Sequence, residues 1–379
     1  MDFELSQDHK VLQDAVRDFV NKEIKPIAIK IDEDHAIPDE LVRKMGEMGL
    51  LGSYLPEKYG GAGFDMLSYA IVVEEVSKAC GSSGVLISAH TSLASGPIYT
   101  FGTEEQKQKW LPALNSGETI GCFLLTEPDA GSDAGGTATT YKREGDEFVI
   151  NGSKTFITNG GYLGTGVLLA SYDRSLKHKG ISAFIVDLKS PGVTILKNEN
   201  KMGIRGSYTT AFAFDNLRVP VENLLGQEGK GFNVAMDTLN GGRIGIASQA
   251  LGIAEGAFER ALAYSKERKQ FGQSISEFQA IQFKLADMWT RIETSKLLTY
   301  KAAWLKDKKK SYTMESAMCK LHASETATFV TKEAIQIHGG YGYIVDYEVE
   351  RMYRDAKITE IYEGTNEVQR VVISKLLLS

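Results

Sequence analysis

Apolar residues recur at helical spacing near both ends of the chain. Residues 221–379 contain no proline, although the chain has eight upstream. Because proline interrupts helices, a long proline-free tract with this spacing predicts a helical bundle. Ile253, Ala257 and Ala261 form one apolar stripe, on the side opposite the charged Glu255. The same helical pattern occurs in residues 12–20, 69–80, 85–95, 281–292 and 368–376.

In the middle of the chain, the apolar residues follow the spacing of β-strands rather than that of helices. The run DEFVINGSKTFIT places Asn151-Gly152 between two β-prone stretches, which predicts a hairpin. GVLLASYD, GISAFIVDL, GVTILKN and AFAFDNLRVP follow at strand-and-turn spacing. We therefore expect an α+β protein with an N-terminal all-α domain at residues 1–118, a central β domain at 119–227 and a C-terminal helical domain at 228–379.

Charge and cysteine content exclude several classes of function. The chain has 379 residues and a formal net charge of -6, so no basic surface for nucleic acid is expected. The start, MDFELSQDHK, has no signal-peptide pattern, and no apolar run is long enough to span a membrane. The three cysteines are far apart and the histidines form no ligand pair, so we predict no metal site. We expect a cytoplasmic protein, in a bacterium.

Common catalytic signatures are absent, and one carboxylate stands out. Neither a G-x-G-x-x-G fingerprint nor a G-x-S-x-G elbow occurs. Glu363 lies before a Gly364-Thr365 break, where Thr365 or Asn366 can cap a following helix. Burial at such a bend would raise its pKa and suit proton abstraction, but the residues alone favour a surface glutamate, because carboxylates with a perturbed pKa are a minority. His338, beside two glycines, is more typical of a structural histidine than of a base.

Six separated motifs, in order along the chain, resemble the acyl-CoA dehydrogenases. They are LTEPDAGSDAGG (125–136), KTFITNGG (154–161), GGRIGIASQALGIAEGA (241–257), ERKQFGQSISEFQ (267–279), IQIHGGYGY (335–343) and RDAKITEIYEGTNEVQR (354–370). The likeness is closest to the short-chain, butyryl-CoA type. It implies a helical domain, a β domain and a four-helix bundle, with FAD between the last two, usually in a homotetramer.

The resemblance implies that Glu363 is the catalytic base. It would remove a proton from Cα of an acyl-CoA thioester while a hydride leaves Cβ for FAD, giving a trans-2-enoyl-CoA. The nascent enolate needs stabilisation, which the backbone N–H of Glu363 would supply in such enzymes. Electrons would pass to electron-transferring flavoprotein, as in fatty-acid β-oxidation, or the reaction would run in reverse in a fermenter.

The resemblance also assigns binding residues. Thr126, Phe156 and Thr158 match residues beside the flavin ring, while Arg268 and Gln279 match residues that reach the FAD of a neighbouring subunit. The cofactor-binding set is Phe123, Leu125, Thr126, Ser132, Phe156, Ile157, Thr158, Arg268, Phe271, Gln279, Gln336, Ile337, Gly339, Gly340, Thr365 and Glu367. The substrate-binding set is Ser132, Asn240, Arg243, Tyr362 and Gly364.

Departures from the family pattern refine the expected substrate. The family often has Asp where this chain has Asn240, and a small residue where it has Leu124. Isovaleryl-type members carry their base at the position of Gly242, and glutaryl-type members carry an arginine at Gly84. A short, straight acyl-CoA is therefore expected, with a branched one next. A flavin oxidase and a non-catalytic acyl-CoA-binding protein of the same fold stay open.

Overall fold

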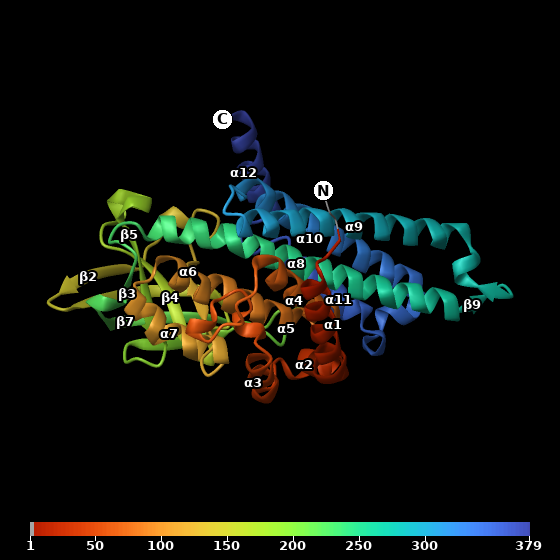
Figure 1. The fold of residues 1–379 in the computed structure, drawn as a ribbon, viewed down its shortest axis with the longest axis horizontal. Helices are drawn as coiled ribbons and strands as arrows, with labels where there is room; N and C mark the ends of the chain where they lie inside the picture. Colours follow the sequence, from red (N-terminus) through yellow and green to blue (C-terminus); the bar gives the residue numbers. More distant parts are fainter. Residues whose placement is uncertain (1–3) are drawn as a thin grey trace.

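The N-terminal part of the chain is helical. The computed structural model describes residues 4–379 (Figure 1). Local capping starts two of the helices: Ser6 Oγ accepts a hydrogen bond from His9 N, and Thr103 forms a capping box with Gln106. The elements are α1 (Gln7–Phe19), α2 (Ala28–Asp34), α3 (Asp39–Glu47), α4 (Met66–Ala79), α5 (Gly81–Ser88), the π-helix η5 (Ala89–Ser95), α6 (Gly96–Phe101) and α7 (Glu104–Ser116).

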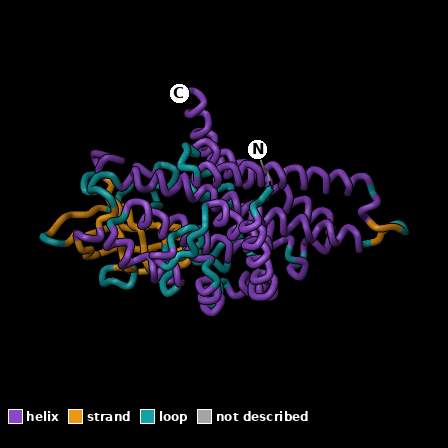
Figure 2. Tube along the Cα trace, viewed as in Figure 1, coloured by secondary structure: helices purple, strands orange, loops and turns teal. Residues whose placement is uncertain are grey.

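A single eight-stranded sheet occupies the middle of the chain. Its order is β6-β7-β3-β2-β4-β5-β8, with β1 parallel to β4. The strands are β1 (Cys122–Leu124), β2 (Thr140–Glu144), β3 (Glu147–Thr158), β4 (Thr165–Ser171), β5 (Ile181–Asp187), β6 (Val193–Asn198), β7 (Thr209–Pro220) and β8 (Leu224–Leu225). Figure 2 shows these strands gathered at one end of the molecule.

The hairpin predicted at Asn151-Gly152 is wrong. Both residues lie inside the continuous strand β3, where the pairing with β7 shifts register between Ile150 and Gly152. Gly152 has φ 149°, and a Cβ there would come within 2.8 Å of Thr139 side-chain atoms. The glycine therefore serves a bulge rather than a turn, since bulges accept residues that leave the regular ladder.

Long helices form the C-terminal part. They are α8 (Gly231–Glu267), α9 (Gln279–Asp307), α10 (Thr313–His338), α11 (Val349–Ile358) and α12 (Asn366–Leu378), with a small hairpin of β9 (Lys269–Gln270) and β10 (Gln273–Ser274) between α8 and α9. In Figure 1 this hairpin lies at the end of the molecule farthest from the sheet. The predicted arrangement of helical, β and helical parts is confirmed.

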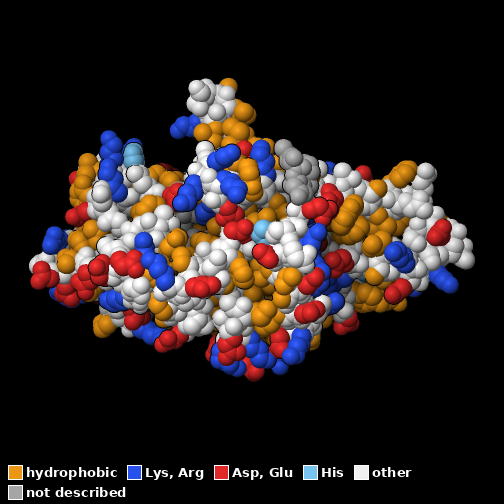
Figure 3. Space-filling view, in the orientation of Figure 1, with side chains coloured by type: hydrophobic (Ala, Val, Ile, Leu, Met, Phe, Trp, Pro, Cys, Tyr) orange, Lys and Arg blue, Asp and Glu red, His pale blue; other side chains and the backbone are white. Residues whose placement is uncertain are grey.

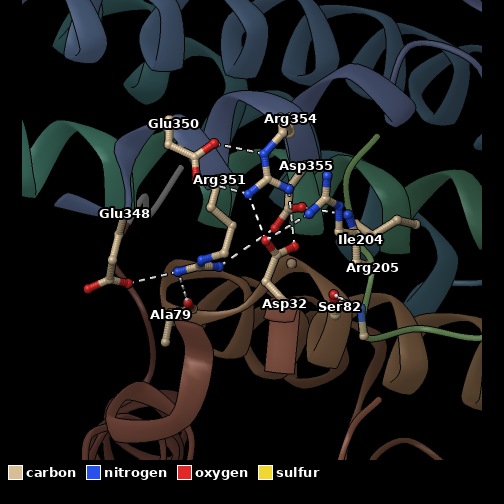
Figure 4. Close-up of polar contacts among 12 residues, drawn as sticks. Asp32, Ala79, Ser82, Ile204, Arg205, Glu348, Glu350, Arg351, Arg354 and Asp355 are labelled. Carbon is tan, nitrogen blue, oxygen red and sulfur yellow. Dashed lines mark hydrogen bonds and ion pairs between the residues drawn. The ribbon is translucent and has the colours of Figure 1, made fainter. Parts of the chain in front are cut away.

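A charged network fixes α11 against the other two parts (Figure 4). Arg354 donates from its two terminal nitrogens to Asp32 of α2, at 3.1 and 2.7 Å. The neighbouring Asp355, which is buried, accepts a hydrogen bond from Ile204 N in the loop before β7. Ile204 has φ 44°, which is unusual for a β-branched residue, so this loop is held in a strained conformation. The helix that leads to Glu363 is thus tied to both the N-terminal and the β part.

The surface is mixed in charge, with apolar patches on the C-terminal helices. Figure 3 shows hydrophobic side chains gathered on the projecting α12. The exposed apolar residues of α9 and α12 are Phe283, Trp289, Leu297, Trp304, Val371, Leu376, Leu377 and Leu378. No helix within residues 4–379 has the length and apolar character needed to cross a membrane.

Candidate active site

Glu363 lies in a turn between two helices, as the sequence predicted. The turn follows α11 and ends at Thr365, whose side chain accepts from Val368 N at 3.3 Å and caps α12. Glu363 has φ 51° and Gly364 has φ 89°, both left-handed. The side-chain amide of Gln369 donates to the carbonyl oxygens of Gly364 (2.8 Å) and Glu363 (3.3 Å). These bonds hold a glutamate in a backbone conformation that non-glycine residues seldom adopt.

The Glu363 carboxyl group is directed at the middle of α8. A Cβ built at Gly242 would overlap Glu363 Oε2 and stand 2.7 Å from Leu93 Cδ2, so only glycine leaves room there. Glu363 Oε2 is shielded from solvent and has no hydrogen-bond partner among the described residues. Burial raises the pKa of Glu363 to about 8, although the charges of Lys320 and Arg243 act to lower it. The group can therefore exchange a proton near neutral pH.

Two buried cations accompany this carboxylate. Arg243 of α8 is 6% exposed and donates from Nη1 to Asn240 Oδ1 at 2.8 Å. Lys320 of α10 is fully buried and donates to Asn366 Oδ1 at 3.1 Å. Burial lowers the pKa of Lys320 to about 8. Lys320 was not predicted from the sequence. The available signal was its place on one face of α10 with the small residues Ser324 and Ala327.

Polar groups close the space beside the carboxylate. The Tyr362 hydroxyl donates to Gln249 Oε1, and Gln249 Nε2 donates to Gly81 O at 2.9 Å. One turn nearer to Gly242 on α8, a Cβ at Gly245 would overlap the hydroxyls of Ser88 and Tyr69. Glycine at positions 242 and 245 thus lets the Glu363 carboxyl group and the hydroxyls of Ser88 and Tyr69 approach the backbone of α8 closely.

The β part presents an exposed aromatic ring between two threonines. The pairing of β3 with β7 shifts between Lys154 and Ile157, and Phe156 there has φ 57° and is 61% exposed. Thr126 and Thr158 are half-buried, and Thr155 N donates to Thr126 O at 2.9 Å, which joins the two segments. Phe123, Leu125 and Ile157 are buried in the core.

A fully buried ion pair fixes this surface. Lys154 Nζ donates to Glu127 Oε1 at 2.7 Å and to Leu125 O at 2.9 Å. Glu127 also accepts from the backbone N–H groups of Ala138 and Thr139. The loop that carries Thr126 and Ser132 is therefore locked to β3, because a buried charge must keep its partner.

An open cavity of about 750 Å³ adjoins Ser132. It lies between the loop that carries Ser132, the helical turn η8 (Arg174–Gly180) and the start of α8. Arg174, Lys177 and His178 line one side, and Phe232 and Met236 of α8 line another. A cavity with cationic and apolar walls suits a long, anionic ligand.

Three other predicted cofactor residues lie at the end of the fold opposite the sheet. Arg268 lies beside the hairpin, with its guanidinium 5.6 Å from the centre of the Tyr341 ring, and Phe271 at the tip is 94% exposed (Figure 1). Gln279 is exposed at the start of α9. A single chain does not bring this group together with Phe156.

The glycine turn after α10 lies near the hairpin. Gln336, Gly339 and Gly340 are exposed, and a Cβ at either glycine would meet nothing within 4 Å. Ile337 is buried. His338 donates from Nδ1 to Ala334 O at 2.7 Å and stacks on Tyr264, which agrees with a structural histidine. Glu367 is exposed in the first turn of α12.

Family models match the chain in three consecutive parts. The acyl-CoA dehydrogenase N-terminal domain matches residues 6–118, the middle domain residues 122–217 and the C-terminal domain residues 229–378. The chain therefore belongs to the acyl-CoA dehydrogenase family. Both the family and the fold class expected from the sequence are confirmed.

Individual relatives are of the short-chain type. A "short-chain specific" acyl-CoA dehydrogenase of Clostridium acetobutylicum is 56% identical over 374 residues, which cover 99% of both chains. The solved structure of butyryl-CoA dehydrogenase from Megasphaera elsdenii superposes with a TM-score of 0.98 at 47% identity, over 100% of both chains. A structure from work on the electron transferring flavoprotein of Acidaminococcus fermentans has a TM-score of 0.99 at 52% identity, over 100% of both chains.

Proposed function

We propose that this protein is an FAD-dependent dehydrogenase of short-chain acyl-CoA thioesters, with Glu363 as the base. The observation that carries the proposal is the Glu363 carboxyl group over Gly242, shielded from water, with a free oxygen and a pKa of about 8. A base whose pKa lies near the working pH is suited to removing a weakly acidic proton from Cα. The similarity to short-chain specific and butyryl-CoA relatives supports the substrate class.

The backbone of Glu363 supports the same role. Its N–H donates to no other group within residues 4–379, because the residue lies outside both flanking helices. Such a donor is available to a thioester oxygen, where negative charge develops as the Cα proton leaves. Glu363 would then contribute its carboxylate and its own amide to one reacting unit, and Tyr362 and Gly364 would flank it.

The face of the β part fits a flavin. The exposed Phe156 ring offers an apolar contact, and the half-buried hydroxyls of Thr126 and Thr158 offer polar contacts at its edges. FAD bound there would supply a hydride acceptor for the substrate Cβ. The buried Lys154–Glu127 pair would keep these three residues in place.

The division of the cofactor residues supports the proposed homotetramer. Exposed residues at one end are Arg268, Phe271, Gln279, Gln336, Gly339 and Gly340, whereas Phe156 lies at the other end. A second copy of the chain can bring the two groups together at one cofactor. The apolar residues exposed on α9 and α12 supply surface for such assembly, because large exposed apolar patches mark interaction sites.

CoA would occupy the cavity at Ser132, and a short acyl chain would lie beside Glu363. The cationic Arg174 and Lys177 suit the phosphates of CoA. Gln249, held by Tyr362, limits the length of the acyl chain. A Cβ at Gly84 would overlap Ser77, so no arginine fits there for a dicarboxylic substrate. A branched short-chain acyl group is the second candidate.

Electron-transferring flavoprotein is the proposed electron acceptor, with net flux in either direction. The likeness to a structure from work on such a flavoprotein supports it.

The protein would act in the cytoplasm of a bacterium. The divisions 1–118, 119–227 and 228–379 are proposed as its domains, since the helix α7, the strand β8 and the helix α8 end or begin next to them.

The test is an anaerobic absorbance spectrum of the purified protein before and after addition of butyryl-CoA, repeated with isobutyryl-, hexanoyl- and octanoyl-CoA. We expect a flavin band that butyryl-CoA bleaches most strongly. Glu363→Gln should keep the band and lose the bleaching. A protein that takes up no FAD would favour the non-catalytic alternative, and rapid reoxidation in air would favour an oxidase. Bleaching of the Glu363→Gln variant at the wild-type rate would refute the assigned base.

A further inference from the structure

We propose that Lys320 is a positioning residue for the base: its ammonium group holds the turn that carries Glu363, and its charge favours the ionised form of the Glu363 carboxyl group. This inference rests on the proposed function of Glu363.

Lys320 anchors one end of the turn to α10. Its Nζ donates to Asn366 Oδ1 at 3.1 Å, and Ser324 Oγ donates to the same oxygen at 3.0 Å. Asn366 N in turn donates to Glu360 O at 3.0 Å, across the turn. The Glu360 carboxylate accepts from Thr328, also on α10, at 2.7 Å. Hydrogen bonds from α10 therefore hold both ends of the 360–366 segment, and Glu363 lies between these two attachment points.

The hydrogen bond to Asn366 does not require a positive charge on its donor. Asn366 is neutral, so a hydroxyl or an amide on α10 could bond it without the cost of burying an ammonium group. Lys154 provides a contrast, because that equally buried lysine is paired directly with Glu127 at 2.7 Å. Lys320 has no carboxylate within 4.0 Å among residues 4–379. Because this buried, charged lysine has no carboxylate in direct contact, we infer that its charge acts on a group farther away.

Glu363 is the group on which this charge acts. Besides Lys320 and Arg243, Tyr69 and Tyr362 lie close enough to Glu363 for its charge to add to the raised pKa of their hydroxyls. Of the two cations, Lys320 lowers the pKa of Glu363 more than Arg243 does.

The effect of the surrounding charges on the pKa of Lys320 also links it to Glu363. Glu363 is the strongest of the charges that raise the pKa of Lys320, ahead of Glu360 and Glu367, while Arg243 lowers it. Arg243 also has a partner of its own, Asn240. Each of Lys320 and Glu363 thus favours the charged form of the other.

The decisive variant is Lys320→Met, which keeps the length of the side chain and removes its charge. The readout is the rate of flavin bleaching by butyryl-CoA in a stopped-flow instrument between pH 6 and pH 10. We expect the pH midpoint of the rate to rise by about one unit or more, as for loss of a nearby opposite charge. The rate near pH 7 would then fall about tenfold or more and recover at high pH.

Two controls separate charge from structure. Asn366→Ala breaks the link to the turn but leaves the ammonium, so the rate should fall equally at all pH values without a shift of the midpoint. Lys332→Met removes an ammonium from α10 itself; that side chain is 67% exposed and paired with Glu333. Solvent screens that charge, so its profile should match the wild type.

A measurement without turnover tests the same point. The infrared band of the protonated Glu363 carboxyl, identified by its loss in Glu363→Gln, should persist to higher pH in Lys320→Met than in the wild type. If Lys320→Met fails to fold, Lys320→Gln is used in its place in both measurements. An unchanged midpoint in both readouts overturns the role of Lys320. Wild-type protein that butyryl-CoA never bleaches would instead overturn the proposed function.

Discussion

Gly242→Ala is expected to disable the base while leaving the fold intact. The new methyl group would overlap Glu363 Oε2 and lie 3.1 Å from Glu363 Cδ. The methyl group would also stand 2.7 Å from Leu93 Cδ2, but both contacts are with the ends of flexible side chains, which can rotate away at modest cost in stability. Alanine in the interior of a helix also gains about 0.5–1 kcal/mol over glycine. We therefore expect normal expression, normal FAD content and a Tm close to that of the wild type.

The effect on the reaction should be large. Restoring an ordinary contact moves the carboxylate by about 1 Å, and a misplacement of that size costs on the order of 100-fold in rate. A loss of that size corresponds to about 2.7 kcal/mol of transition-state stabilisation. The same displacement leaves the cationic cavity at Ser132 untouched, so the affinity for butyryl-CoA should change little.

The assay is the rate of flavin bleaching by saturating butyryl-CoA under anaerobic conditions. Gly241→Ala is the matched control, because a Cβ there would be 2.6 Å from Lys306 Nζ, again the end of a flexible side chain but one outside the site. We expect the control to react at nearly the wild-type rate. A Gly242→Ala enzyme that also reacts within about threefold of the wild type would refute the placement of the carboxylate over this glycine.

Three further outcomes follow from the site. The pKa of Glu363 is raised to about 8 in the folded protein, so its contribution to stability is present at low pH and lost as the pH rises to 8. Glu363→Gln should therefore gain in Tm relative to the wild type at pH 9 but not at pH 4, and an equal difference at both pH values would contradict the burial described. Asn240→Asp keeps the oxygen that accepts from Arg243, so the Kd for butyryl-CoA should change less than about threefold, and a 30-fold change would show that the neutral amide tunes this site. Arg268→Ala should lose FAD during dialysis through loss of a charge-assisted bond, and retention of stoichiometric flavin would remove Arg268 from the cofactor site.

Local signals in the sequence located the turn of Glu363 correctly. A glycine followed by a capping threonine acts over three or four residues, and the structure has Thr365 as the N-cap of α12. The same kind of reasoning failed at Asn151-Gly152, where neighbouring strands continue straight through a pair that usually turns. There the pairing of β3 with β7 and β2 outweighs the local preference.

Features that depend on packing between distant segments were not predictable from one sequence. Lys320 is buried because the helices α8, α9, α11 and α12 pack against α10, and nothing beside it in the sequence marks it as different from a surface lysine. The separation of Arg268 from Phe156 is likewise a property of the complete fold. The resemblance assigned Arg268 to the FAD of a neighbouring subunit, and the structure shows that the hairpin beside Arg268 and the strand of Phe156 lie at opposite ends of one chain.

The anchoring of α11 has a consequence for how activity is acquired during folding. Asp32, Ile204 and Arg354 belong to three regions that lie far apart along the chain, and the turn of Glu363 follows directly after the helix that they hold. Each region could complete its own secondary structure and still leave the base out of place. Regain of activity after dilution from denaturant should therefore lag behind regain of helical circular dichroism, because docking of large segments is slower than helix formation. The length of this delay would measure the rate at which α11 docks against the other two parts of the chain.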